Sequence, residues 1–142
     1  LLKAGTSDSR RPWFRVGEYK KLPNEVGGEE TTPPEQVAAQ MKELLADYNA
    51  LPEKTFEDIV AFHRAFECIH PFQDGNGRVG RLVMFKECLS NGIVPFIIDE
   101  ELKLFYYRGL HEWDRAHGYL LDTCRTAQDN FRAVLHYFKI EM

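Results

Sequence analysis

Four side chains able to do acid–base or anion-binding chemistry fall within the segment HPFQDGNGRVGR, residues 70–81. His70 is an imidazole that can be neutral near pH 7 and accept a proton from a hydroxyl group. Asp74 is a hard carboxylate of the kind that binds Mg²⁺ together with nucleotide phosphates. Arg78 and Arg81 lie three residues apart, hence on one face of a helix, and guanidinium groups suit phosphate oxygens. The segment therefore predicts a site for a phosphate-bearing ligand beside a general base.

Two turn-forming dipeptides, Asp74-Gly75 and Asn76-Gly77, lie between these side chains. Asn-Gly usually joins two strands of a hairpin, but here both flanking segments have helical periodicity. Because helices can be joined with far less glycine, Gly75, Asn76 and Gly77 predict a close approach of the backbone to a ligand. They precede a helix expected to begin near Arg78, whose first N–H groups and dipole favour an anion. We therefore expect these amides to form an anion cradle.

Each of these residues also has a purely structural interpretation. His70 could simply end a helix, Asp74 could form a turn, and the two arginines could face solvent. Phe72 is expected to be a core anchor that holds the loop down. The combination of residue types within one short segment is what favours a ligand site over these separate explanations.

Other phosphate and metal motifs fit the spacing poorly. A Walker loop requires Gly-Lys, which does not follow these glycines, and an EF-hand starting at Asp74 lacks the required Gly and Glu. His63, Glu67 and His70 fall at i, i+4 and i+7 of one predicted helix, which could suggest a metal hydrolase. The H-E-x-x-H pattern is absent, so this alternative is weaker than the phosphate site.

Apolar residues recur every three or four positions on both sides of the segment, which predicts helices over 32–138. The stretch from Arg11 to Glu30 is rich in turn formers and predicts a loose hairpin or loop. The expected fold class is thus all-α, a helical bundle preceded by a short β-hairpin. Five helices are expected, from an N-cap at Thr32, from Thr55, from near Arg78 to Asn91-Gly92, from Asp99, and after a break at His117-Gly118.

Composition bounds the class of protein. The chain has 142 residues, 44% of them hydrophobic, which predicts one domain spanning residues 1–142. A net charge of -4 argues against a general nucleic-acid binder, and no apolar run is long enough for a membrane span. Cys68, Cys88 and Cys124 are odd in number and lie in apolar periodic stretches, which predicts reduced core residues in a cytoplasmic protein. The first residue is not methionine, so we expect a piece of a longer protein.

Residues 70–81 match in full the pattern H-x-F-x-[DE]-G-N-G-R-x-x-R, and in this the chain resembles the Fic (filamentation induced by cyclic AMP) domain family. Eight specified positions make a chance match on the order of 10⁻¹⁰ per window. The helical pattern and the turn-rich stretch before it are also similar to that family's core and target-docking flap. The resemblance implies a protein adenylyltransferase that moves AMP from ATP to a Tyr, Thr or Ser hydroxyl of a target protein and releases pyrophosphate.

The resemblance also implies a role for each matching residue. His70 would be the general base, and Asp74 would coordinate Mg²⁺ between the α- and β-phosphates. The nucleotide-binding positions would be Gly75, Asn76 and Gly77 as the anion hole, Arg78 on the phosphates, Arg81 at the γ-phosphate, and Tyr107, beside Tyr106, in the adenine pocket. Helix-spaced tyrosines are also common in cores, and Trp113-Asp114 replaces an asparagine present in many members, which leaves base selectivity open.

Many members carry an inhibitory helix with the pattern [ST]-x-x-x-E-[GN]. The best match here, Thr31 to Glu35, is followed by Gln36, so we expect any inhibitory glutamate upstream of Leu1 or on a partner chain.

Alternative functions stay open. Phosphoryl transfer, another nucleotide or removal of AMP would be a different transfer, although the intact G-N-G-R disfavours the kinase-like branch. A nucleotide-binding scaffold without turnover would be expected to lack His70 or Asp74, and both are present.

Overall fold

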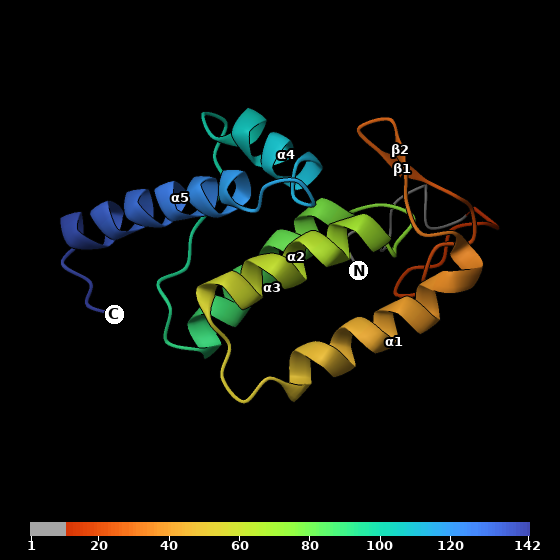
Figure 1. Ribbon diagram of the computed structural model, residues 1–142, viewed down its shortest axis with the longest axis horizontal. Helices are drawn as coiled ribbons and strands as arrows, with labels where there is room; N and C mark the ends of the chain where they lie inside the picture. The colour runs from red at the N-terminus through yellow and green to blue at the C-terminus, as the bar shows by residue number, and fades with distance from the viewer. Residues whose placement is uncertain (1–10) are drawn as a thin grey trace. The chain divides into compact units, whose positions relative to one another are not determined.

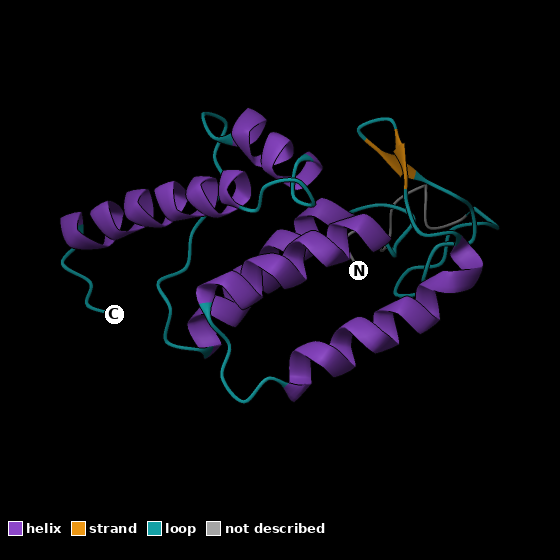
Figure 2. Cartoon of the chain, in the orientation of Figure 1, coloured by secondary structure: helices purple, strands orange, loops and turns teal. Residues whose placement is uncertain are grey.

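The computed structural model describes residues 11–142, and its elements are almost all helical (Figures 1 and 2). Two short strands precede five helices. In chain order they are β1 (Glu25–Val26), β2 (Glu29–Glu30), α1 (Pro34–Ala50), α2 (Phe56–Ile69), α3 (Asn76–Ser90), α4 (Lys103–His111) and α5 (Gly118–Tyr137). The all-α class with a short N-terminal β-hairpin is confirmed.

The hairpin is much shorter than the turn-rich stretch that contains it. β1 and β2 are antiparallel, with Glu25 opposite Glu30 and Val26 opposite Glu29. The rest of the stretch consists of turns and loop, because its prolines and glycines interrupt any longer alternation of apolar and polar residues.

The chain divides into two compact units, and both α2 and α3 contribute to each. The first unit takes its described residues from Leu1–Pro52 and Ala65–Gly80, and the second comprises Glu53–Arg64 and Arg81–Met142. The single domain expected over residues 1–142 stays a prediction.

Two helix starts differ in how they are capped. Thr55 opens α2 as predicted, because its hydroxyl accepts the Asp58 N–H at 3.2 Å while Asp58 Oδ2 accepts the Thr55 N–H at 3.0 Å. The N-cap predicted at Thr32 is wrong: α1 is capped by Pro33 without a side-chain hydrogen bond. The Thr32 hydroxyl instead donates to Gln40 Oε1 at 2.6 Å. Pro34, with its fixed φ, takes the first helical position and delays the helix start.

One further boundary lies earlier than predicted: α3 begins at Asn76 rather than near Arg78, so the second glycine of the motif is already helical. The predicted break at His117-Gly118 is confirmed, since α4 ends at His111 and α5 begins at Gly118. In both cases the glycine lies in the first turn, where the N–H groups have no intrahelical acceptor and a helix breaker is tolerated.

The core of the first unit forms along the predicted apolar faces. Val37 and Met41 of α1 pack with Phe66 and Ile69 of α2. Phe72 is partly buried against this cluster, with its ring centroid 6.4 Å from that of Phe66. The expectation that Phe72 anchors the loop to the core is confirmed.

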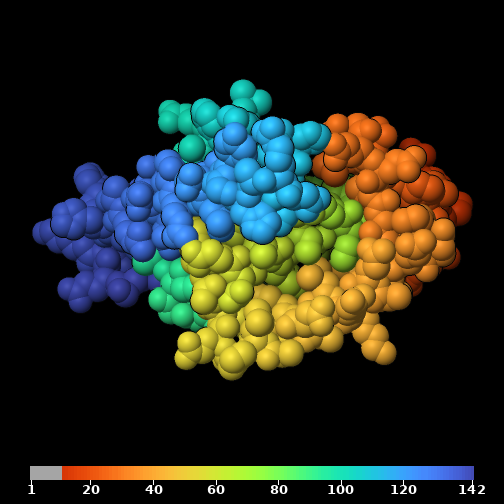
Figure 3. Space-filling model, viewed as in Figure 1, coloured from red at the N-terminus to blue at the C-terminus, as the bar shows by residue number. Residues whose placement is uncertain are grey.

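The second unit is organised around the close pairing of α4 with α5. The teal and light-blue atoms of the two helices adjoin in Figure 3. Gly109 permits this approach, because a Cβ at this position would lie 2.6 Å from Leu120 Cα. Tyr106 and Leu120 are both fully buried in this unit.

The cysteines do not all behave as predicted. Cys88 and Cys124 are buried in the second unit, and burial raises the pKa of their thiols to about 11 and about 12. Cys68 is exposed, so its assignment to the core is wrong. Adjacent helical positions point about 100° apart, and the inward face of α2 is already taken by Phe66 and Ile69.

Among residues 11–142, no helix meets the length and apolarity needed to cross a membrane.

We expect Gly109→Ala to destabilise the fold, because the new methyl group would overlap the main chain of α5. Overpacking of this kind lowers the free energy of unfolding by about 1–3 kcal/mol. Urea denaturation followed by circular dichroism measures the change. Gly118→Ala is the matched control, since nothing lies within 4 Å of a Cβ at that position. Equal stability of the two variants would contradict the tight α4–α5 contact.

Candidate active site

The loop between α2 and α3 is closed by the Asn76 side chain. Asn76 Oδ1 accepts the Phe72 N–H at 2.8 Å, and Asn76 Nδ2 donates to the Phe72 carbonyl at 2.8 Å. Only 2% of Asn76 is exposed. Its amide side chain is therefore occupied within the loop, and only its backbone N–H remains for the predicted anion hole.

Gly75 makes the turn from the loop into α3. Its φ of +81° lies in the left-handed region that glycine adopts without strain. Its carbonyl accepts the Val79 N–H at 3.0 Å, and its own N–H donates to Asp74 Oδ1 at 2.7 Å. Because that N–H is engaged by Asp74, an incoming anion would have to displace the carboxylate to use it.

The N-terminus of α3 supplies the remaining donors of the predicted cradle. The N–H groups of Asn76, Gly77 and Arg78 are in the first turn and have no acceptor within the helix. α3 has 15 residues and no acidic side chain in its first turn. Its dipole therefore favours an anion at this end.

His70 terminates α2 in an uncommon conformation. Its φ is +50°, and its N–H donates to the Phe66 carbonyl at 2.9 Å. Burial lowers the pKa of the half-buried imidazole below its usual 6.5, and the charge of Lys20 lowers it further. The Glu67 carbonyl and the Asp74 carboxylate oppose this shift. The ring is thus neutral at pH 7, as a general base must be.

The Nδ1 atom of His70 is buried. The Glu67 carbonyl is near enough to favour the charged ring, but Nδ1 makes no hydrogen bond of good geometry within the part of the chain that the structure describes. Proximity alone does not make a hydrogen bond, so the ring is not held through Nδ1.

The charged side chains at the start of α3 face solvent. Asp74 Oδ1 and Arg78 Nη2 are 4.0 Å apart, with about half of each side chain exposed. An exposed ion pair this long contributes little to stability. Both groups are therefore accessible to a ligand.

Arg81 and Tyr107 belong to the second unit. The Arg81 guanidinium carbon lies 5.8 Å from the ring centroid of Tyr106. Tyr107 is 45% exposed, and its ring centroid is 5.3 Å from that of Tyr106. The first unit thus brings His70, Asp74, Gly75, Asn76, Gly77 and Arg78 together. The roles of Arg81 and Tyr107 rest on the motif and on the family resemblance.

The donor set suits a metal shared with a ligand better than a metal held by protein alone. Within residues 11–142, no three His, Cys, Asp or Glu side chains come together as a metal site. His63, Glu67 and His70, the set that could suggest a metal hydrolase, therefore form no such group, and His63 Nε2 lies 2.5 Å from the Tyr106 hydroxyl. A single accessible carboxylate, Asp74, fits Mg²⁺, which commonly takes one or two carboxylates together with substrate phosphates.

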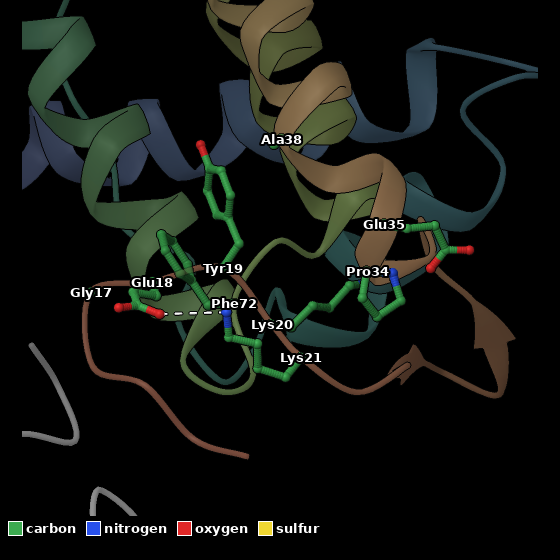
Figure 4. A pocket seen from close by; sticks show the side chains of 9 residues that line it. All are labelled: Gly17, Glu18, Tyr19, Lys20, Lys21, Pro34, Glu35, Ala38 and Phe72. Carbon is green, nitrogen blue, oxygen red and sulfur yellow. Dashed lines mark ion pairs between the residues drawn. The ribbon is translucent and has the colours of Figure 1, made fainter. Parts of the chain in front are cut away.

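A groove of about 740 Å³ runs beside the N-terminal segment of the first unit (Figure 4). Its walls come from that segment, from the start of α1 and from the motif residue Phe72. In Figure 4 the rings of Tyr19 and Phe72 lie close together, and their centroids are 6.0 Å apart. Lys21 pairs with Glu18 at 3.5 Å along one side.

Comparisons with known proteins agree with this fold and motif. A solved Fic-domain signalling protein from Bacteroides thetaiotaomicron superposes with a TM-score of 0.65 at 31% identity, over 90% of this chain and 52% of that one. A Fic family protein from Desulfovibrio desulfuricans gives a TM-score of 0.69 at 23% identity, over 94% of this chain and 45% of that one, which supports the fold alone.

Two relatives of this chain are named protein adenylyltransferases. Protein adenylyltransferase fic-1 of Caenorhabditis elegans is 35% identical over 81 residues, 55% of this chain and 16% of that protein. Protein adenylyltransferase Fic of Drosophila melanogaster is 31% identical over 97 residues, 66% of this chain and 20% of that protein. The chain thus spans a fifth or less of the length of these relatives.

A helical fold with a glycine-bearing bend between a histidine and two arginines is typical of nucleotide-transferring domains of the Fic type. The Fic/DOC family model matches residues 2–88, and the chain belongs to the Fic/DOC family.

We expect Asn76→Ala to lower the free energy of unfolding by about 1–3 kcal/mol, because it leaves the part-buried Phe72 N–H without its acceptor and removes one of the two donors to the Phe72 carbonyl. Chemical denaturation measures the loss. The matched control is Asn49→Ala on the exposed face of α1, which should change stability by no more than about 0.5 kcal/mol. If both variants unfold at the same urea concentration, the Asn76 side chain does not close the loop.

Proposed function

We propose that this domain transfers AMP from ATP to a Tyr, Thr or Ser hydroxyl of a target protein and releases pyrophosphate. The observation that carries the proposal is that three kinds of group lie within one compact unit. They are the imidazole of His70, whose lowered pKa keeps it neutral, the carboxylate of Asp74 and the N-terminal amides of α3. Family membership supports it, as do relatives named protein adenylyltransferases.

The proposed reaction is a single displacement at the α-phosphorus. His70 accepts the proton of the target hydroxyl as its oxygen forms a bond to the α-phosphorus. The bond from that phosphorus to the oxygen bridging it to the β-phosphorus breaks, and pyrophosphate leaves with the bonding electron pair. A positioned base contributes roughly 10²- to 10⁴-fold to the rate of such a step.

The chain's own groups stabilise the charge that develops on the phosphate. In the proposal, the amides of Gly75, Asn76 and Gly77 donate to phosphate oxygens, and Arg78 binds the same phosphates. Asp74 would hold Mg²⁺ against the α- and β-phosphates, where the ion would neutralise negative charge. Because Gly75 N–H now donates to Asp74, nucleotide binding would exchange this contact for one with phosphate.

Four further parts of the proposal rest on the resemblance. Arg81 would bind the γ-phosphate, and Tyr107 would contribute to the adenine pocket. The stretch 11–30 would act as the flap on which the target docks, by main-chain pairing with the short β-hairpin. An inhibitory helix would be supplied from upstream of Leu1 or by a partner chain, and a cytoplasmic location stays a prediction.

Transfer from labelled ATP tests the proposal directly. Incubating the protein with α-labelled or γ-labelled ATP, Mg²⁺ and host lysate should label a protein band from the α position only. His70→Ala should remove at least 10²-fold of that signal, because the base is lost. His136→Ala, in the exposed last turn of α5, is the control and should label normally.

The other results would each reject adenylyl transfer. Label from the γ position alone indicates phosphorylation. A lysate that contains an AMP-modified target and loses that mark indicates AMP removal. Nucleotide binding without His70-dependent label, with a verified target present, indicates a scaffold.

The rate of transfer should fall on the acid side with a midpoint below pH 6.5. The folded pKa of His70 is lowered from 6.5, and only the neutral ring accepts a proton, so activity persists at a lower pH than for an ordinary histidine. The pH dependence of kcat/KM for ATP measures this midpoint. A midpoint at or above 6.5 would contradict the assignment of His70 as a desolvated base.

A further inference from the structure

We propose that Lys20 and Asn24 are positioning residues for the transfer reaction: they hold the consecutive main-chain carbonyls around His70 and so fix the imidazole in place. The inference rests on the proposed function and deepens it. It concerns the first unit alone, where the N-terminal segment meets the loop between α2 and α3.

Four successive carbonyls, from the last residue of α2 to Phe72 in the loop, accept hydrogen bonds from these two residues. Lys20 Nζ donates to the Ile69 carbonyl at 3.2 Å, and the Lys20 N–H donates to the Pro71 carbonyl at 2.8 Å. Asn24 Nδ2 donates to the carbonyls of His70 and Phe72 at 3.4 and 2.9 Å. The backbone on both sides of the His70 side chain is therefore held by the same short segment.

The Lys20 ammonium group is almost completely removed from water. Only 3% of Lys20 is exposed, and this burial lowers its pKa. An ammonium group has three donor hydrogens, which matches its three acceptors: the Ile69 carbonyl, Asn24 Oδ1 at 2.7 Å and Thr31 Oγ1 at 2.9 Å. With all three donors satisfied, the buried group can keep its charge.

These acceptors are all uncharged, so hydrogen bonding to them does not by itself explain why a charged residue is at this position. A neutral donor could bond the same oxygens without the cost of burying a charge. The positive charge lies at the C-terminal end of α2, where the helix dipole favours a cation. It also acts on the imidazole of His70, whose pKa it lowers.

His70 has a backbone conformation that requires such support. Its φ of +50° is unfavourable for a residue with a side chain, and Pro71 follows it. Backbone conformations of this kind persist only where neighbouring groups impose them, and they cluster at functional sites. Without Lys20 and Asn24, the loop could relax and move the base away from its reacting hydroxyl.

Three groups from three parts of the unit bear on His70. Lys20 comes from the N-terminal segment, Asp74 from the loop and the Glu67 carbonyl from α2. Lys20 disfavours the charged ring, whereas the other two favour it. Removing the Lys20 charge should therefore raise the pKa of His70, and replacing it with another cation should not.

A merely structural role for Lys20 predicts different results. A residue that only stabilised the fold would change the amount of folded protein, and the folded enzyme would have the wild-type kcat. A positioning role lowers kcat in folded enzyme, leaves KM for ATP little changed, and moves the acid limb of the rate profile.

The test compares Lys20→Met with Lys20→Arg, and uses Lys42→Met on the exposed face of α1 as the matched control. Each variant is assayed well below its melting temperature. We expect Lys20→Met to lose on the order of 10- to 100-fold in kcat, with KM for ATP within about threefold. The acid-side midpoint of its pH–rate profile should shift to higher pH. Lys20→Arg should keep the wild-type midpoint, and Lys42→Met should match wild type in every parameter.

An NMR titration provides a readout that needs no turnover. Labelled histidine rings are titrated in wild type and Lys20→Met, with His70→Ala assigning the signal. A higher pKa for His70 in Lys20→Met supports the inference even if no adenylyl transfer is found, and then only the proposed function fails. An unchanged kcat together with an unchanged His70 pKa overturns it.

Asn24→Ala decides the matter if Lys20→Met does not fold. This substitution removes the Asn24 donor to the His70 and Phe72 carbonyls. It keeps the Lys20 charge, although the ammonium loses one of its three acceptors. A fall of at least tenfold in kcat, with KM for ATP little changed, supports the inference. Wild-type kcat in folded Asn24→Ala overturns it.

Discussion

The pair of hydrogen bonds between the Asn76 side chain and the Phe72 main chain is the constraint on which the motif loop depends. It joins the first residue of α3 to the loop that leaves α2, so the histidine and the helix N-terminus cannot move independently. A buried amide whose donor and acceptor are both engaged is costly to break. The loop can therefore contain two glycines and present the first N–H groups of α3 while it keeps its conformation.

The same loop is held from its other side by polar groups of the N-terminal segment. Gln73 reaches toward that segment, where its Oε1 accepts the N–H groups of Lys21 and Leu22 at 3.1 Å each. Lys20 and Asn24 reach the opposite way, from the segment to the loop carbonyls. Side chains thus cross this contact in both directions. A segment proposed to dock the target is in this way coupled to the residue proposed to activate the target's hydroxyl.

Much of the fold could be predicted because its signals are local. The apolar period indicated the helices, and the Thr55 and Asp58 pair marked the start of α2. Boundaries at glycine and proline were less predictable. Pro33, and not Thr32, is the N-cap of α1, and α3 begins at Asn76 and includes Gly77. These errors share a cause, since helix ends are set by competition between several acceptors that a linear pattern does not rank.

By itself, the sequence determined which chemical groups are present and that His70 and Asp74 shortly precede a helix start, because those relations span only a few residues. Only the tertiary structure decided that Asn76 serves the loop with its side chain, that Cys68 faces outward, and that Lys20 is buried against Ile69. Lys20 and Ile69 are far apart in the chain, and a lysine in a turn-rich stretch ordinarily indicates a solvated surface. Burial and long-range hydrogen bonds are properties of the folded chain, so no local pattern could reveal them.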